Sequence, residues 1–227
     1  MDTKGGRRMA VRNQFDEQLQ SLHHQLLTMG MLVEEALYQA VKSLVDKNVK
    51  LAQEVIDGDR EINEAEMDIE KKCFTLIALQ QPVGSDLRRI ATTLKVSTDL
   101  ERIADHAVSI AKTTVRLQSE VYAKPLIDIP KMGKLVQGMV RDALDAYIKM
   151  DKDEARNIAN RDDEIDALYK QIFTELIGLM TQDRSLIHQA THLLLTAQYL
   201  ERIGDYVTNI CEWIVYMDSG KKVELNQ

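Results

Sequence analysis

Two short segments of this chain carry paired carboxylates at the same spacing. Residues 100–105 are Leu-Glu-Arg-Ile-Ala-Asp and residues 200–205 are Leu-Glu-Arg-Ile-Gly-Asp, so the segment is duplicated at an offset of 100 residues. On an α-helix, acids four positions apart share one face, with Cβ atoms about 5–6 Å apart. Like charges this close are unfavourable unless solvent or a cation compensates them. The duplicated acids are Glu101 and Asp105 in the first copy, Glu201 and Asp205 in the second.

Further acids are expected beside these pairs, on the helices that precede them. Asp59 and Asn63 in the first half correspond to Asp162 and Asp166 in the second. In an antiparallel hairpin they reach the level of the duplicated acids, because they lie about as far before the turn as those acids lie after it. The same reasoning places other acids at this level on the first helix of each half: Glu34, Glu35 and Asp142.

Clustered oxygen ligands define the candidate site. Carboxylate and amide oxygens suit hard cations such as Mg²⁺, Mn²⁺, Ca²⁺ or iron. The predicted metal ligands are Glu101, Asp105, Glu201, Asp205, Asp162, Asp166, Asp59 and Asn63.

A simpler alternative is that these acids are only solvated. If Leu100 and Ile103 belong to the core, Glu101 and Asp105 face outward, where Arg102 can pair locally with an acid. Two observations favour a site. Both pairs survive the duplication together, and a small residue, alanine or glycine, precedes each aspartate and leaves room for close approach.

Composition bounds the classes of protein that fit. The 227 residues include only 10 glycines and 3 prolines, with 44% hydrophobic residues, which is typical of an all-helical protein. A formal net charge of −7 argues against binding nucleic acid over a broad surface. Cys73 and Cys211 have no close partner in sequence, which indicates free thiols of a reducing compartment. Neither a signal peptide nor a membrane-spanning run is evident, so we expect a cytoplasmic protein that meets membranes only through partners.

Helical spacing of apolar residues predicts an all-α chain of six helices, arranged as two similar antiparallel three-helix bundles in tandem. The first bundle is expected over residues 13–119 and the second over 131–220, joined by a connection at 120–130. Residues 1–12 are basic and contain two adjacent glycines, so we expect a disordered tail there. Approximate helix bounds are 13–46, 48–79, 85–119, 131–150, 152–181 and 184–219, with caps at Asn48, Ser85, Asp151, Asp183 and Gly220.

The predicted core positions repeat as well. Ile62, Ile69 and Cys73 are matched by Ile165, Ile172 and Leu176 at an offset of 103 residues. Alternating steps of three and four mark the seam of a helical bundle. On the two motif-bearing helices this seam comprises Val96, Leu100, Ile103, Ala107, Ile110, Thr114 and Leu117, and Thr196, Leu200, Ile203, Val207, Ile210, Ile214 and Met217.

Histidines offer weaker candidates. His188 and His192 share a helix face at a spacing that zinc sites use, but no Glu follows His188, and surface packing is the simpler interpretation. His106 adjoins Asp105 and is a candidate auxiliary ligand. The chain has no Gly-rich phosphate loop and no nucleophile with a base at suggestive spacing.

Taken together, the duplicated motif and several other segments resemble the PhoU family of bacterial phosphate-signalling regulators. The resemblance covers residues 15–217 and includes 29–34, 55–59, 81–88, 199–205 and 209–212. It implies a fold of two three-helix bundles in tandem. The family's metal motif, Glu or Asp followed four positions later by Asp, carries over onto the acid pairs of both copies. It also fits Asp162 with Asp166, whereas Asn63 after Asp59 departs from it.

The resemblance also implies a function. PhoU-like proteins link the ATPase subunit of the Pst phosphate transporter to a PhoR-type sensor histidine kinase, repress the phosphate regulon and restrain phosphate uptake. They are adaptors rather than enzymes, are often homodimers, and in some members bind metal at the acidic motifs. Iron, zinc, magnesium and manganese are the expected candidates here.

Two other classes stay open from the residues alone. A di-metal carboxylate enzyme of ferritin type would need core-facing Glu and a Glu-x-x-His motif, and the chain contains no such motif. A metal-binding helical scaffold, such as a paralogue with a different partner, is excluded by nothing except the resemblance.

Overall fold

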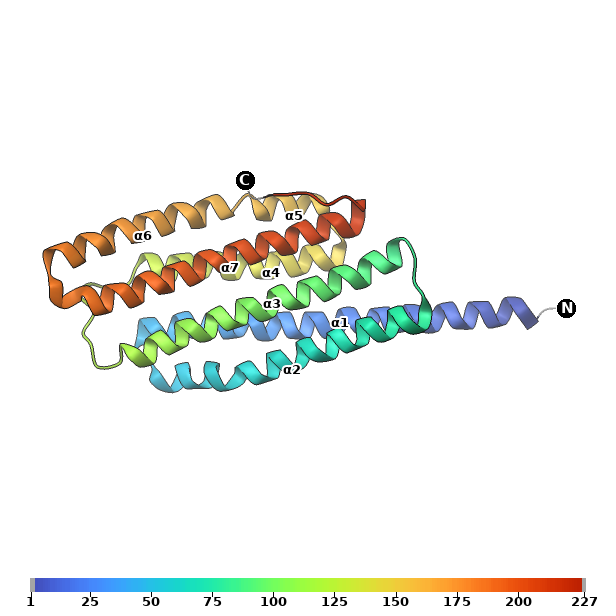
Figure 1. Cartoon of the computed structure of the whole chain (residues 1–227), viewed down its shortest axis with the longest axis horizontal. Coiled ribbons are helices and arrows are strands. Elements are labelled where there is room, and N and C mark those ends of the chain that lie inside the picture. The colour runs from blue at the N-terminus through green and yellow to red at the C-terminus, as the bar shows by residue number, and fades with distance from the viewer. Residues whose placement is uncertain (1–2, 226–227) are drawn as a thin grey trace.

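The computed structural model describes residues 3–225, with side chains from residue 13 onward. All regular structure in this range is helical (Figure 1). The elements are α1 (Thr3–Asp46), α2 (Val49–Gln80), α3 (Ser85–Arg116), α4 (Asp128–Lys149), α5 (Lys152–Ala159), α6 (Asp162–Gln182), η1 (Arg184–Leu186) and α7 (Ile187–Ser219).

Two similar antiparallel three-helix bundles form the fold, as the sequence predicts. In the first, α1, α2 and α3 pack against one another, and in the second α7 packs against α4, α6 and the short α5. The bundles lie side by side, with α3 against α7 and α1 against α4 (Figure 1). Arg88 lies near Met217 and Arg102 near Tyr206, so α3 and α7 run antiparallel.

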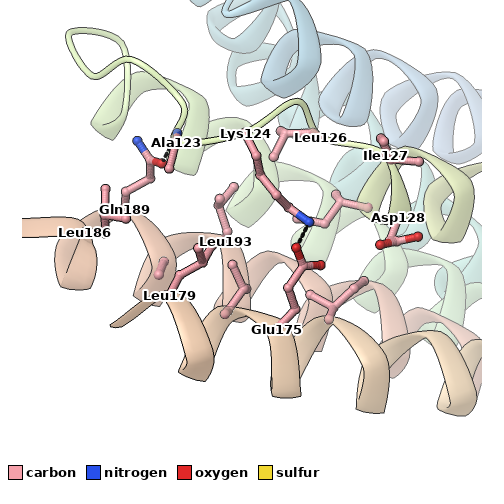
Figure 2. Close-up of a pocket in the computed structure, with 14 residues that line it drawn as sticks. Ala123, Lys124, Leu126, Ile127, Asp128, Glu175, Leu179, Leu186, Gln189 and Leu193 are labelled. Carbon is pink, nitrogen blue, oxygen red and sulfur yellow. Dashed lines mark hydrogen bonds and ion pairs between the residues drawn. The ribbon is translucent and has the colours of Figure 1, made fainter. Parts of the chain in front are cut away.

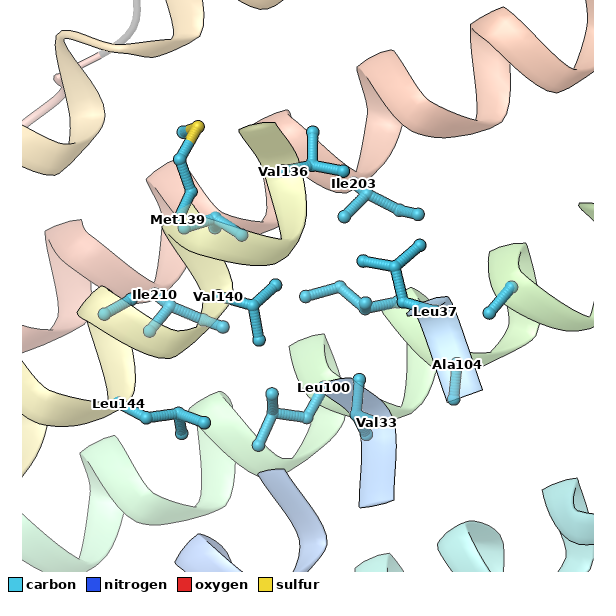
Figure 3. Close-up of a cluster of buried hydrophobic side chains, with 14 of the residues drawn as sticks. Val33, Leu37, Leu100, Ala104, Val136, Met139, Val140, Leu144, Ile203 and Ile210 are labelled. Atoms are coloured by element: carbon cyan, nitrogen blue, oxygen red, sulfur yellow. The ribbon is translucent and has the colours of Figure 1, made fainter. Parts of the chain in front are cut away.

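One continuous core joins the bundles. Figure 3 shows Leu100 of α3 and Ile203 of α7 converging with Leu37 of α1 and Val140 of α4. All these side chains are fully buried. The predicted seam positions of α3 and α7 are buried throughout, which confirms the spacing argument. Because the apolar surface between the bundles is shared, the two halves form one packed body.

Helix ends follow capping chemistry at several predicted points. Asn48 accepts a hydrogen bond from the Leu51 N–H at 3.0 Å, and Asp151 accepts one from the Glu154 N–H at 3.0 Å. Ser85 is not the cap that we predict: it is the first residue of α3, and Gly84 precedes it with a left-handed φ of 58°. Asp183 caps η1 rather than α7 directly, accepting from the Ser185 N–H at 2.8 Å.

Several bounds differ from the prediction: α3 ends at Arg116 and α4 begins at Asp128, so the connection lies at 117–127 rather than 120–130. Helix α1 begins at Thr3, so a disordered tail is wrong for residues 3–12, while residues 1–2 lie outside the described part. The single helix expected over 152–181 is broken between α5 and α6 at residues 160–161. At the break, the Arg161 guanidinium reaches back to the Asp142 carboxylate of α4 at 2.5 Å. This tertiary ion pair has no signature in the local sequence.

Candidate functional site

The duplicated motif occupies equivalent environments on α3 and α7. In both copies the first leucine, the isoleucine and the small residue are buried, the glutamate is half-buried, and the arginine and the aspartate are exposed. The burial pattern is the same position by position, because each helix directs the same apolar seam into the shared core. The acids therefore lie along the outer edges of this seam.

A first acidic group joins α2 to α3. Burial, and then the charge of Asp105, raises the pKa of Asp59. Burial also raises the pKa of Glu101, followed by the charges of Asp105, Glu66 and Asp59. Asn63 donates its amide N–H to the Asp59 carboxylate at 3.1 Å. These charge effects indicate that Asp59, Glu101 and Asp105 lie near one another where α2 packs on α3.

A second acidic group joins α6 to α7. Burial raises the pKa of Glu201, and the charges of Asp205, Asp166 and Asp162 raise it further. Although Asp205 is exposed as a residue, partial desolvation of its carboxylate raises its pKa, followed by the charge of Asp166. Each half thus gathers the four predicted residues from its second and third helices into one group.

Sequence reasoning missed one member of the first group. Glu66 lies on α2 and adds its charge to that felt by Glu101. The signal was available, because Glu66 follows Asp59 by seven positions and Asn63 by three, and both steps return to the same helix face.

The acids predicted from α1 and α4 make other contacts. Glu34 accepts from the Gln137 amide at 3.4 Å, Glu35 accepts from Gln39 at 2.6 Å, and Asp142 pairs with Arg161. None of these three is among the charges that raise the pKa of Glu101 or Glu201, so the two acidic groups described here draw on two helices of each bundle. A residue's level along a bundle does not determine which face it occupies.

His106 is packed between the two halves. Its ring is stacked 5.5 Å from the ring of Tyr199 and 5.7 Å from that of Tyr206, measured between centroids. Burial and then the Arg202 charge lower its pKa. Arg102 in turn lies over the Tyr206 ring, 5.6 Å from its centroid.

The chemistry of the acidic groups fits a hard cation. Asp59 Oδ1 and Asn63 Oδ1 are buried acceptors without a hydrogen-bond partner among the described residues. In the second half Gly204 leaves the space that Asp162 occupies, because a β-carbon there would come closer than 3.0 Å to Oδ1 of Asp162.

All-oxygen donors suit magnesium, manganese or iron better than zinc, which prefers nitrogen and sulfur. As they stand, no three His, Cys, Asp or Glu side chains of the described range are arranged to hold a metal, so binding would require carboxylates to move.

A small apolar cavity under the connection was not anticipated. It has a volume of about 30 Å³ and lies between residues 123–129 and helices α6 and α7 (Figure 2). Lys124 and Glu175 pair across its mouth, and Gln189 accepts from the Ala123 N–H at 2.9 Å. A space of this size holds about one or two waters rather than an organic ligand.

Comparison with known proteins decides the family. The sequence model of one protein family, the PhoU domain, matches residues 26–114 and again residues 129–214, which are the two halves of the duplication. The chain belongs to the PhoU family.

PhoU relatives match over nearly the whole chain. A phosphate-specific transport system accessory protein PhoU homolog of Clostridium acetobutylicum is 44% identical over 217 residues, covering 95% of this chain and 99% of the relative. The homolog of Streptococcus pneumoniae serotype 4 is 38% identical over 216 residues, with coverage of 95% and 100%.

Solved PhoU structures have the same fold. The phosphate transport system regulatory protein PhoU from Streptococcus pneumoniae superposes with a TM-score of 0.87 at 36% identity, covering 92% of this chain and 99% of that one. PhoU from Pseudomonas aeruginosa gives 0.88 at 36% identity, with coverage of 91% and 100%. Like the sequence, the described helices include none long and apolar enough to cross a membrane.

Proposed function

We propose that this chain is an accessory regulator of phosphate transport. It acts as an adaptor between a Pst-type phosphate transporter and a PhoR-type histidine kinase, represses the phosphate regulon and restrains uptake, without catalysing a reaction itself. The observation that carries this proposal is the match of both halves to the PhoU domain, together with coverage of 95% of this chain by a transport-system accessory homolog. In this role the chain works in the cytoplasm, as a homodimer, and reaches the membrane through its partners.

The packing of the two bundles supports an adaptor role. Because α3 packs along α7 around one core, the two motif-bearing helices are held in a fixed relation. A rigid face of this kind can bind a partner without the entropic cost of ordering loops. The acidic groups lie on either edge of the α3–α7 seam, so a partner seated there would meet both.

Charge at the acidic groups is the element that we propose to be regulated. Desolvation, and then repulsion between the acids, already raises the pKa values of Asp59, Glu101, Glu201 and Asp205, so these groups disfavour full ionisation. A divalent cation would supply the compensating positive charge. The residues that would hold it are Asp59, Asn63, Glu101 and Asp105 in one half and Asp162, Asp166, Glu201 and Asp205 in the other.

Deletion of the gene in its host tests the regulatory role. Alkaline phosphatase activity is measured in phosphate-rich medium, where the phosphate regulon is normally repressed. We expect high activity in the deletion strain and low activity once the intact gene is restored. Activity that stays low in the deletion strain, with no second PhoU-like gene present, would contradict the proposal and favour a scaffold for a different partner.

A further inference from the structure

Two histidines at the start of α7 form a cluster that the proposed function does not use. His188 and His192 are four positions apart on one helix face, and their ring centroids lie 4.7 Å apart at an interplanar angle of 80°. The His188 side chain is 61% exposed, so an ion in solution can reach it. Imidazoles at this helical spacing can bind one metal ion together, as in sites built on two histidines at i and i+4.

Glu120 holds the first histidine in one orientation. Its carboxylate lies 2.5 Å from Nδ1 of His188, and Gln189 donates to the other carboxylate oxygen at 3.3 Å. With Nδ1–H donating to Glu120, Nε2 of His188 keeps its lone pair. A carboxylate on the far nitrogen of a metal-binding histidine fixes the tautomer and makes the ligand more basic.

The second histidine is also suited to bind a metal. Nδ1 of His192 is buried and finds no hydrogen-bond partner among the described residues. Its ring lies against that of His188, so both imidazoles are presented on the same helix face. A ring nitrogen without a hydrogen-bond partner can give its lone pair to a metal ion when the other nitrogen carries the proton.

We propose that His188 and His192 together bind one divalent transition metal ion, with Glu120 positioning His188. Two nitrogen ligands select Cu²⁺, Ni²⁺ or Zn²⁺ over Mg²⁺ or Mn²⁺, and water completes the coordination. The site differs in donor chemistry and location from the all-oxygen acidic groups. It stands whether or not those groups bind metal.

The position of this site connects it to the link between the bundles. The backbone carbonyl of Glu120 accepts from Lys47 in the α1–α2 turn. Gln189, next to His188, accepts from the Ala123 N–H and donates to the Val121 carbonyl, each at 2.9 Å. An ion at His188 would therefore brace the segment that joins the first bundle to the second.

The test is calorimetric titration of the untagged full-length protein with NiCl₂. Nickel is chosen because it favours imidazole over the carboxylates of the acidic groups. The variants are His188→Ala, His192→Ala and Glu120→Gln, and His24→Ala removes an exposed histidine outside the cluster as a control. A further variant carries Gln in place of Glu101 and Glu201 and Asn in place of Asp105 and Asp205. It shows whether bound Ni²⁺ is held by the histidines or by the acidic groups.

We expect one Ni²⁺ per chain in wild type, in the His24 control and in the variant of the duplicated acids. Loss of either cluster histidine should weaken binding at least about tenfold, and loss of the Glu120 charge by about 10- to 100-fold. Electron paramagnetic resonance of the Cu²⁺ complex should show hyperfine coupling to imidazole nitrogen. Absence of Ni²⁺ binding to wild type, or unchanged binding in both His variants, would overturn the site. Unchanged binding in the Glu120 variant would overturn the positioning role.

Discussion

Gly204 of α7 and Asp162 of α6 fit together only because the glycine has no side chain. A β-carbon at Gly204 would approach Oδ1 of Asp162 closer than 3.0 Å and the Ile165 side chain at 3.5 Å. Asp162 is 5% exposed. The first half has Ala104 at the equivalent position, where Asp59 is less deeply buried. The two acidic groups are thus similar in composition but not in packing.

The variant Gly204→Ala should therefore be destabilised. The added methyl group forces Asp162 out of its place, and overpacking of this kind costs about 1–3 kcal/mol of unfolding free energy. Gly178→Ala on α6 is the matched control, because nothing lies within 4 Å of its added carbon. That control should gain up to about 1 kcal/mol from helix propensity. Urea unfolding measures both, and a Gly204 variant as stable as the control would contradict the packing.

A buried carboxyl on α3 should make stability depend on pH. Asp99 is 7% exposed, and burial raises its pKa from 3.8 to about 6, with Glu212 adding to the rise while Arg102 and Lys95 oppose it. The folded state then holds the proton more tightly than the unfolded state. Its contribution to stability falls as pH rises from about 4 to 6, and the loss is complete above that window.

The variant Asp99→Asn should remove this loss. At pH 8 it should be more stable than wild type by up to about 3 kcal/mol, since the pKa is raised by about two units and each unit is worth about 1.4 kcal/mol. The advantage should nearly vanish at pH 3.5, where the wild-type carboxyl is protonated in the folded state and mostly protonated in the unfolded state. Urea unfolding from pH 3.5 to 8, with the exposed Asp145→Asn as control, checks this. A stability difference that does not vary with pH would be inconsistent with the raised pKa.

A buried hydrogen-bond chain ties three helices together. His23 of α1 and Thr93 of α3 each lie 2.6 Å from the Tyr147 hydroxyl of α4, and Thr93 also donates to the Arg89 carbonyl at 2.9 Å. One assignment gives every donor an acceptor. In it, His23 donates to the Tyr147 hydroxyl, Tyr147 donates to Thr93, and Thr93 donates to the Arg89 carbonyl. Burial, and then the Arg89 charge, lower the pKa of His23 from 6.5 to about 4.

Removing the central hydroxyl should weaken the join between the bundles. Tyr147→Phe leaves the His23 Nδ1–H without its acceptor and removes the hydrogen bond that Thr93 accepts, while Thr93 still donates to the Arg89 carbonyl; the loss costs about 1–3 kcal/mol. The double variant with Thr93→Val should cost less than the sum of the single changes, because the two side chains share one interaction. Independently, the contribution of His23 to stability should fall as pH drops from 6.5 to 4, because only the unfolded state protonates His23 there, and a His23→Gln variant should lose this dependence. If the costs of the two single variants simply add in the double variant, Tyr147 and Thr93 are not coupled and the proposed hydrogen-bond chain is ruled out.

The negative charge of the acidic groups should lower thermal stability in the absence of metal and raise it in the presence of metal. In metal-free buffer, Glu101→Gln with Asp105→Asn should raise the melting temperature, because it relieves the repulsion that raises the pKa values of Asp59 and Glu101. With MnCl₂ the wild type should gain stability, because an ion that binds only the folded state stabilises it. The variant should gain less. The exposed Asp68→Asn on α2 is the control, and an equal gain in all three proteins would exclude a metal site at this group.

The sequence predicts the fold well because one physical pattern is repeated. Leu100, Ile103 and their counterparts at 200 and 203 follow a bundle seam, and hairpin geometry then brings Asp59 to Glu101. The break between α5 and α6 coincides with a long-range ion pair, in which Arg161 at the break contacts Asp142 of α4. Spacing cannot show such a contact. The same limit explains Glu34, whose partner Gln137 lies on the opposite bundle.

The way in which the two bundles pack against each other could not be predicted from the sequence either. The stacking of His106 on Tyr199 and Tyr206, and the fit of Gly204 to Asp162, depend on how α3 meets α7 and how α6 meets α7. Helical periodicity specifies the buried stripe of each helix but not the partner that covers it. Residues 3–12 differ for another reason: α1 continues through glycines that would ordinarily disfavour helix.

An adaptor role is tested most directly by binding. The purified full-length chain is titrated against the ATPase subunit of its own phosphate transporter and against the cytoplasmic part of its own histidine kinase, with and without MnCl₂. A saturable complex with each partner is expected, weakened in a folded variant that carries Gln or Asn at Glu101, Asp105, Glu201 and Asp205. Failure to bind either partner under both conditions would contradict the adaptor role.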